Sequence, residues 1–261
     1  MDIWLSILAG LAAAAIVTGW QGYKDSPWEG FIPGRFARSY VVALSVGLVC
    51  WCLNASGMLV FDNAGVLLLS VLSFERGIGE LYKGFIRRES HPEYEKLFER
   101  LHIEFRSQAV RAVAGILVAL VVAASILIVL SRVLSSALLL PHIPAGLIAG
   151  LSGGLLSATG GAIKDSQFEG FRIKKFIRSP IVGMLGGMIL VHLTDNPLLL
   201  LLGCTGFERV AVELYKTFLT RQIRGIFCGQ EPKYRQWLQS RWVFAMLYST
   251  GAISLVILLL R

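Results

Sequence analysis

The chain has 261 residues, of which 55% are hydrophobic and only 16% are charged, and its mean hydropathy is +0.65. Soluble domains carry about a quarter charged residues, so this composition excludes an ordinary soluble protein and predicts a polytopic membrane protein. The net charge of +8 lies mainly in short segments between apolar runs, which indicates membrane topology and anionic lipids rather than a nucleic-acid partner.

Apolar runs follow one another along the chain. A helix needs about 20 apolar residues to cross roughly 30 Å of hydrocarbon, and unbroken Leu, Val and Ala runs favour helices over strands there. The first run has no Lys or Arg ahead of it, which argues against a signal peptide. The long runs are 3–20, 39–61, 109–131, 143–162, 180–194 and 242–260, and two shorter ones are 63–74 and 196–207.

The chain contains two copies of one pattern. KDSPWEGF at 24–31 returns as KDSQFEGF at 164–171, with six of eight residues identical at an offset of 140. FERGIGELYKGF at 74–85 returns as FERVAVELYKTF at 207–218, with eight of twelve identical at an offset of 133. Two ordered blocks predict a duplication of the whole chain, with a first membrane repeat at 1–138 and a second at 139–261.

The basic residues decide whether the two short runs cross the membrane. If both cross, 23 of 25 Lys and Arg residues fall on one side, and only Arg132 and Arg261 lie opposite. Because basic residues favour the cytoplasmic side, both termini are expected on the non-cytoplasmic side of a cytoplasmic or inner membrane. We predict an all-α integral membrane protein of eight transmembrane helices, arranged as two parallel four-helix repeats about a pseudo-twofold axis along the membrane normal.

Short amphipathic helices complete this predicted fold. The segments 92–105 and 234–242 each place aromatic and apolar residues on one face, which suits a helix in the membrane interface. Small residues also predict close approach of the fifth and sixth spans, and of the first and second. The small residues are Gly146, Gly150, Gly154, Gly183 and Gly187 in the second repeat, and Gly10 and Ala14 in the first.

Charged residues lie inside the short runs. A helix starting at Asn63 rises about 1.5 Å per residue, so Glu75 and Arg76 lie roughly 18 to 20 Å along it. A charge at mid-bilayer costs about 2.5–3.5 kcal/mol on insertion scales and normally has a partner inside the protein. Arg76, Glu80 and Lys83 share one helix face and can neutralise one another, whereas Glu75 must find its partner elsewhere.

The duplicated KDS segments are the expected partners of these acids. The Gly-rich stretches TGWQGY and ATGGAI lead into them, so we expect the backbone to leave the helix there and form a re-entrant or tightly packed loop. A ladder of salt bridges that only orients helices is the simpler interpretation of the same residues. The predicted substrate- or ion-binding residues are Lys24, Asp25, Ser26, Glu29, Glu75, Arg76, Glu80, Tyr82, Lys83, Lys164, Asp165, Ser166, Glu169, Glu208, Arg209, Glu213, Tyr215 and Lys216.

Three functions are compatible with such a site. We favour a transporter or channel for a small cation or a proton-coupled solute, because both halves keep the same charged groups; a divalent or monovalent cation is then the expected ligand. The alternative is a membrane enzyme acting on a lipid phosphate, with carboxylates holding Mg²⁺ and Lys24 and Lys164 meeting the phosphate. The third is a membrane scaffold or assembly subunit. A homo-oligomer is compatible with each.

Other chemistry has little support in the sequence. Walker A, GxSxG and HExxH patterns are absent, so the common phosphate-binding and hydrolytic motifs are not available. Cys50 and Cys52 lie about 200° apart on a helix, and the remaining cysteines and the four histidines are scattered. We therefore expect neither a disulfide framework nor a zinc site.

Overall fold

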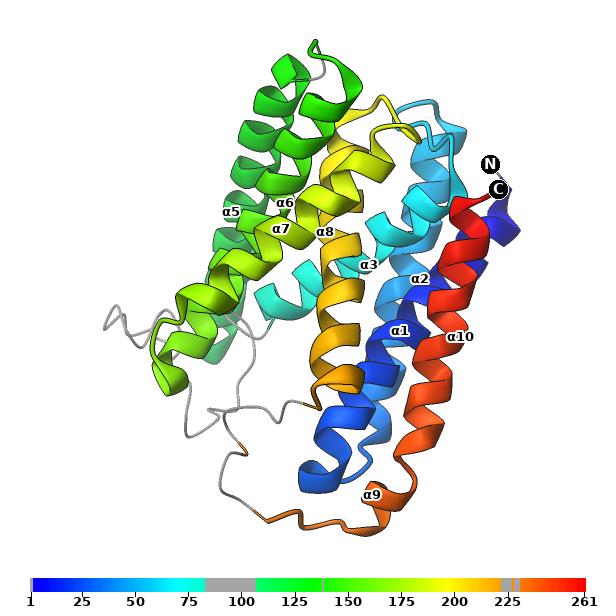
Figure 1. The fold of residues 1–261 in the computed structure, drawn as a ribbon. Helices are drawn as coiled ribbons and strands as arrows, with labels where there is room; N and C mark the ends of the chain where they lie inside the picture. Colours follow the sequence, from blue (N-terminus) through cyan, green and yellow to red (C-terminus); the bar gives the residue numbers. More distant parts are fainter. Residues whose placement is uncertain (1, 83–106, 138, 222–226, 228–230) are drawn as a thin grey trace.

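The computed structural model describes residues 2–82, 107–137, 139–221, 227 and 231–261, with side chains at 108, 111 and 163–169 excepted. All regular elements in this part of the chain are helices, and both termini lie at the same end of the bundle (Figure 1). The helices are α1 (Ile3–Glu29), α2 (Pro33–Ala55), α3 (Ala64–Leu81), α5 (Gln108–Ala137), α6 (His142–Glu169), α7 (Ile173–Leu190), α8 (Pro197–Glu213), the π-helical turn η2 (Leu214–Leu219), α9 (Gln236–Gln239) and α10 (Arg241–Leu259).

Five of the described helices are long and apolar enough to cross a membrane, namely α1, α2, α5, α6 and α10. This agrees with the predicted class of all-helical membrane protein. The other three long helices differ in length or charge. Helices α3 and α7 each carry three charged residues among 18, and α8 has 17 residues. Of these three, α3 and α8 bury at least half of their residues inside the bundle, whereas α7 exposes an apolar face that includes Ile181 and Leu185.

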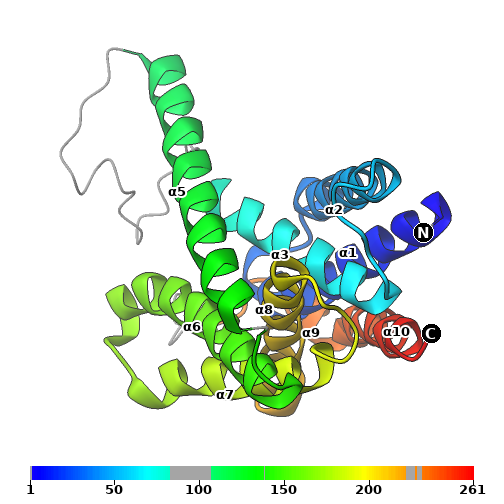
Figure 2. The same ribbon diagram turned by 90° about the horizontal axis from the view of Figure 1, so that it is seen from above.

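Helices α3 and α8 cross in the centre of the molecule (Figure 2). Helices α1, α2 and α10 surround α3, whereas α5, α6 and α7 surround α8. The two halves of the chain are therefore intertwined. The last helix of the first half, α5, packs on α6 and α8, and the last helix of the second half, α10, packs on α1 and α3.

The crossing of α3 and α8 is reciprocal. The Ser73 hydroxyl of α3 donates a hydrogen bond of 2.6 Å to the Leu202 carbonyl of α8. Gly206 of α8 in turn lies against the backbone of Leu69 in α3. At the offset of 133, Ser73 corresponds to Gly206 and Leu69 to Leu202, so each helix makes the other's contact.

Corresponding helix ends have the same local structure. Asn63 begins α3 and Asn196 begins α8, and each side chain accepts hydrogen bonds from two backbone amides of the first turn. The prediction that a helix starts after Asn63 is thus confirmed.

The residues that follow α1 and α6 also correspond. Gly30 follows α1 with φ +75° and Gly170 follows α6 with φ +68°, a backbone conformation that favours glycine.

Small residues bring neighbouring helices close together, as predicted. A methyl group added to Gly146 would lie 2.5 Å from the Gly187 carbonyl oxygen, so α6 and α7 touch through their backbones. Helices α1 and α2 make the related contact, in which a methyl on Gly47 would lie 2.6 Å from the Ser6 carbonyl oxygen. The predicted pairing of the first with the second span, and of the fifth with the sixth, is confirmed.

The KDS segments do not form loops. Helix α1 continues through KDSPWE to Glu29 and includes Pro27, and α6 likewise continues to Glu169. The prediction of re-entrant loops is wrong, because neither set of glycines bends its helix. Gly160 and Gly161 lie inside α6 with nothing within 4 Å of an added methyl, and the glycines before the first segment serve helix packing. Gly22 lies against the Phe244 ring, and a methyl on Gly19 would lie 2.7 Å from Tyr248 Cβ.

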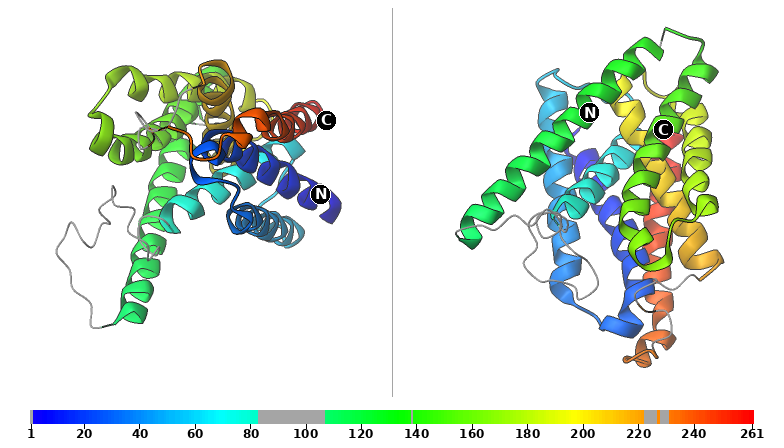
Figure 3. Two further views of the ribbon diagram at one scale, coloured as in Figure 1. Left: turned by 90° about the horizontal axis from the view of Figure 1, so that it is seen from below. Right: turned by 90° about the vertical axis from the view of Figure 1, so that its left-hand side faces the viewer.

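The predicted interfacial segments have different outcomes. The segment 92–105 lies outside the described residues. In the second half, 234–242 contains the short helix α9 and the first residues of α10. Helix α9 lies at the end of the bundle where α1 ends, and the Tyr234 amide donates a hydrogen bond of 2.9 Å to the Pro27 carbonyl (Figure 3).

Candidate functional site

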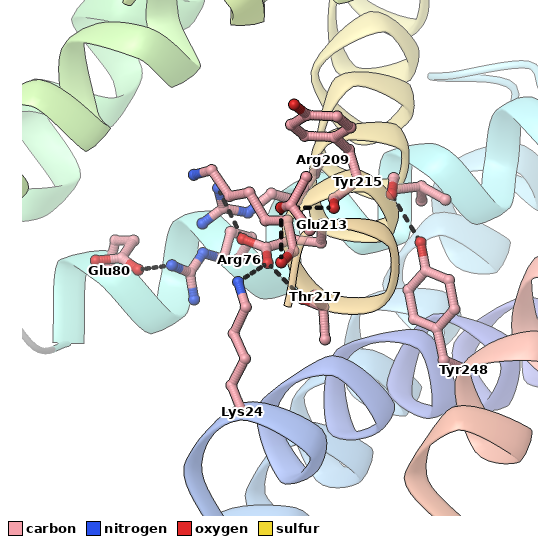
Figure 4. A network of polar contacts seen from close by, with 11 residues as sticks. Lys24, Arg76, Glu80, Arg209, Glu213, Tyr215, Thr217 and Tyr248 are labelled. Carbon is pink, nitrogen blue, oxygen red and sulfur yellow. Dashed lines mark hydrogen bonds and ion pairs between the residues drawn. The ribbon is translucent and has the colours of Figure 1, made fainter. Parts of the chain in front are cut away.

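A buried ion pair connects the two halves of the chain. The Lys24 ammonium of α1 lies 2.5 Å from Glu213 Oε2 at the end of α8, and the two side chains are only 10% and 9% exposed (Figure 4). Lys24 belongs to the first KDS segment and Glu213 to the second FERxxxxELYK block, 189 positions away. The sequence predicted the KDS segments as partners of Glu75 and Glu208, whereas the structure pairs Lys24 with Glu213.

Glu213 has further partners on its own helix. Arg209 Nη1 lies 3.7 Å from Glu213 Oε1, and the Thr217 hydroxyl lies 3.2 Å from Glu213 Oε2 and donates to it. The carboxylate is therefore held from three directions. Thr217 lies in η2, where the helix widens into a π-helical turn, a distortion that is frequent at functional sites.

The first half contains the counterpart of the Arg209–Glu213 pair. Arg76 and Glu80 form a salt bridge on α3, with side chains 17% and 37% exposed (Figure 4). This confirms the predicted i, i+4 pairing within the charged face of that helix. Lys83, the third predicted member of the face, lies outside the described residues. The described part of this half is also π-helical at Tyr82, the counterpart of Tyr215 in η2.

Two arginines outside the predicted site belong to the same arrangement. Arg38 of α2 lies over the Tyr82 ring at 5.8 Å from its centroid, and Arg178 of α7 lies over the Tyr215 ring at the same distance. The available signal was the repeated spacing of Phe36 and Arg38 at 176 and 178, which matches the KDS offset of 140. The match indicates that Arg38 and Arg178 are equivalent, but it does not indicate that each lies over a tyrosine ring.

The cationic groups gather around Glu213. Lys216, one turn beyond Glu213 in η2, lies close enough to Arg178, Arg209 and Lys24 for their charges to act on it. Glu213 is the carboxylate that acts on it among the described residues. Tyr215 is 45% exposed, so its ring lies at the rim of this cluster. We call Lys24, Arg178, Arg209, Glu213, Tyr215 and Lys216 the α8 cluster.

Three of the remaining predicted acids are buried. Glu208 is 1% exposed and its Oε2 has no hydrogen-bond partner among the described residues, while Glu75 is 6% and Asp25 is 9% exposed. Their burial agrees with the prediction that Glu75 and Glu208 face the protein interior. Glu29 instead pairs with Arg35 at the turn between α1 and α2.

Ser26 and the second KDS segment show no side-chain contact to the α8 cluster among the described residues. The Ser26 hydroxyl is buried and donates a hydrogen bond of 2.5 Å to the Gly22 carbonyl, so it satisfies its own helix. In the second KDS segment the backbone forms the last turns of α6, but the side chains lie outside the described residues. These side chains are Lys164, Asp165, Ser166 and Glu169.

A metal site is not assembled from the described acids. Among the residues that the structure describes, no three His, Cys, Asp or Glu side chains are grouped so that they could hold a metal ion. The carboxylates around the α8 cluster are paired with Lys and Arg. The oxygens of Glu213 are already engaged by Lys24, Arg209 and Thr217.

The chain was also compared with known proteins. No model of a protein family, no curated protein and no solved structure matches it.

Proposed function

We propose that this protein is a membrane transporter of eight spans, built as two parallel repeats whose charged motifs form one functional region between them. The reciprocal contact of α3 with α8 supports the twofold relation of the repeats. The exchange of α5 and α10 between the halves, and the repeated Arg–Tyr and Arg–Glu pairs, support it as well. The basic end of the bundle then faces the cytoplasm and its anionic lipids.

The observation that carries this proposal is the ion pair between Lys24 and Glu213. Lys24 and Glu213 are shielded from solvent, and each compensates the other's charge. The pair is stable only while α1 and α8 keep their present positions. A proton or solute that changes the charge at Glu213 therefore changes the relation between α1 and α8. This coupling is what a transporter needs to alternate between two states.

The charge balance of the site favours one class of cargo. The α8 cluster has four cationic groups and one carboxylate among the described residues. A free cation must compete there with the basic groups that already pair with Glu213, whereas a solute with acceptor groups can use those basic side chains as ligands. Of the two cargo classes that the sequence predicts, the proton-coupled solute is the better supported.

The test is transport by purified full-length protein in liposomes under an inward proton gradient. Uptake of Na⁺, K⁺, Mg²⁺ and inorganic phosphate is followed together with internal pH. We expect proton-coupled uptake of at least one of these solutes, and at least a tenfold loss of that uptake in the double variant Lys24→Met, Glu213→Gln.

The control variant is Glu231→Gln, Arg235→Gln, which removes an exposed i, i+4 pair of 3.3 Å at the same end of the protein. Its uptake is expected to equal that of the wild type. If the wild type moves none of these solutes, the transport proposal fails. If the Lys24 and Glu213 variant transports as well as the wild type, the pair is structural, as the scaffold interpretation requires.

A further inference from the structure

Two histidines that lie far apart in the sequence meet at one end of the bundle. His142 is the first residue of α6, and His192 lies in the turn that follows α7. The centroids of their imidazole rings are 5.4 Å apart. The start of α6 and the end of α7 lie at the end of the bundle that also holds both chain termini, whereas α1 ends at the opposite end (Figure 1). The histidine pair is therefore separate from the α8 cluster.

The packing of α6 on α7 places the two rings together. Gly146 lies one turn after His142 in α6. A methyl group added to Gly146 would lie 3.1 Å from Val191 Cγ1, and Val191 is the residue before His192. The His192 amide donates a hydrogen bond of 3.3 Å to the Ile189 carbonyl, which closes the turn. The positions of both histidines thus follow from backbone packing and do not depend on their own side chains.

The separation of the rings matches that of two imidazoles bound to one metal ion. With metal–nitrogen bonds of about 2.0–2.1 Å and tetrahedral angles, the centroids of two imidazoles on one ion lie about 5 Å apart. The observed distance of 5.4 Å is close to this value, and the ring planes are inclined at 39°. Both side chains are exposed, so rotation about the bond to the ring can direct one nitrogen of each ring at a common ion.

Both imidazoles also have nitrogen atoms available as ligands. Among the described residues, neither ring has a hydrogen-bond or ion-pair partner, and each contacts the other. Neutral imidazole is the commonest metal ligand in proteins and suits Zn²⁺, Ni²⁺ and Cu²⁺. Mg²⁺ and Ca²⁺ prefer oxygen ligands, so the pair selects against them.

A cavity beside His142 provides room for a hydrated ion. It has a volume of about 390 Å³ and is lined by Leu140, Pro141, His142, Ala145 and Asp195. Within the described part of the chain, no third His, Cys, Asp or Glu is grouped with the two histidines as a ligand. Water molecules therefore complete the coordination shell, and the exposed Asp195 carboxylate can accept a hydrogen bond from such a water.

We infer that His142 and His192 form a binding site for a divalent transition-metal ion of the class of Zn²⁺, Ni²⁺ and Cu²⁺. The ion joins the start of α6 to the turn after α7. This inference goes beyond the proposed function and does not depend on it, because the site lies at the other end of the bundle from Lys24 and Glu213. The sequence predicts no zinc site because the two histidines come together only through the packing of α6 on α7.

The experiment titrates Zn²⁺ into full-length protein in detergent micelles, purified through a tag without histidine, and follows binding by isothermal titration calorimetry. We expect saturable binding of a single ion per chain that excess Mg²⁺ does not displace. The affinity should fall by about tenfold or more in His142→Gln and in His192→Gln. The control is the double variant His91→Gln, His102→Gln, which removes the other two histidines of the chain and should bind like the wild type.

Cu²⁺ provides a second measurement at the same site. Its electron paramagnetic resonance spectrum should show splitting from two nitrogen ligands in the wild type and from one in each single variant. Absence of saturable Zn²⁺ binding, equal affinity of the wild type and both single variants, or loss of binding in the control variant would overturn the inference. Folding of each variant is checked by size-exclusion chromatography, and His142→Ala and His192→Ala replace a glutamine variant that does not fold.

Discussion

Lys24 and Glu213 give the clearest case of residues whose energetic contributions depend on each other. Glu213 also accepts hydrogen bonds or ion pairs from Arg209 and Thr217, so loss of Lys24 leaves it partly satisfied. Loss of Glu213 leaves several basic groups close together without the carboxylate that they share. The two substitutions are therefore expected to differ in cost, and removal of both charges together is expected to restore part of the loss.

The double-mutant cycle tests this at the level of stability. We expect Glu213→Gln to lower the free energy of unfolding by about 3 kcal/mol and Lys24→Met by less, with the double variant losing less than the sum. The measurement is equilibrium unfolding by SDS titration in mixed micelles. The exposed pair of Glu231 and Arg235 is the control and should give no measurable change. Strict additivity of the two single variants would show that the charges do not interact.

At the scale of the helices, the contact between α3 and α8 depends on one glycine. A methyl on Gly206 would lie 3.0 Å from Leu69 Cα and closer still to the Leu69 carbonyl group, so the two helices would have to separate. Around that contact the leucines of both helices are fully buried. Separation would therefore loosen the centre of the bundle rather than one exposed side chain.

Gly206→Ala is expected to lower the free energy of unfolding by about 1–3 kcal/mol, as overpacking does in well-packed cores. Gly160→Ala is the matched control, because Gly160 lies inside α6 with nothing within 4 Å of an added methyl. Alanine there should be neutral or should stabilise the helix by up to about 1 kcal/mol. Equal effects of the two substitutions, measured by the same SDS titration, would contradict the close contact of α3 with α8.

The helices and the pairs within one helix could be predicted from the sequence, and the reasons are local. Asn63 caps its own helix, and Arg76 and Glu80 are neighbours on one helix, so their structure depends on few other residues. Gly19 and Gly22 were misinterpreted because a glycine that breaks a helix and a glycine that admits a neighbouring helix look the same in sequence. Only the position of α10 shows which of the two applies.

The partners across the bundle could not be predicted for the same reason. Lys24 meets the acid of the other half because the halves are intertwined, and no spacing in the chain encodes that arrangement. Arg178 was missed because its role depends on the Tyr215 ring, which comes from another helix. Sequence periodicity reports which residues share a helix face, whereas the identity of the facing helix is a property of the tertiary structure.

At the scale of the whole molecule, the exchange of last helices makes the halves mutually dependent. Helix α10 packs on α1 through Gly22 and Gly251, and the Tyr248 hydroxyl donates a hydrogen bond of 2.7 Å to the Val210 carbonyl in α8. The last helix of the second half thus touches both halves. Its counterpart α5 packs on α6 and α8. In such an arrangement neither half encloses its own core, and the proposed function gives the two halves a common orientation in the membrane.

That orientation can be tested by labelling single cysteines with a membrane-impermeant maleimide in intact cells and inverted vesicles, after the four native cysteines have been replaced. Ile32→Cys and Phe171→Cys lie at the turns that follow α1 and α6 and should be labelled from the same side. Met58→Cys and Leu140→Cys lie at turns at the opposite ends of their helices and should be labelled from the other side. Basic residues adjoin the first pair of turns, so inverted vesicles should expose Ile32→Cys and Phe171→Cys. Labelling of those two positions from opposite sides would mean inverted repeats, and the charged motifs would then lie too far apart for both to contribute to one site.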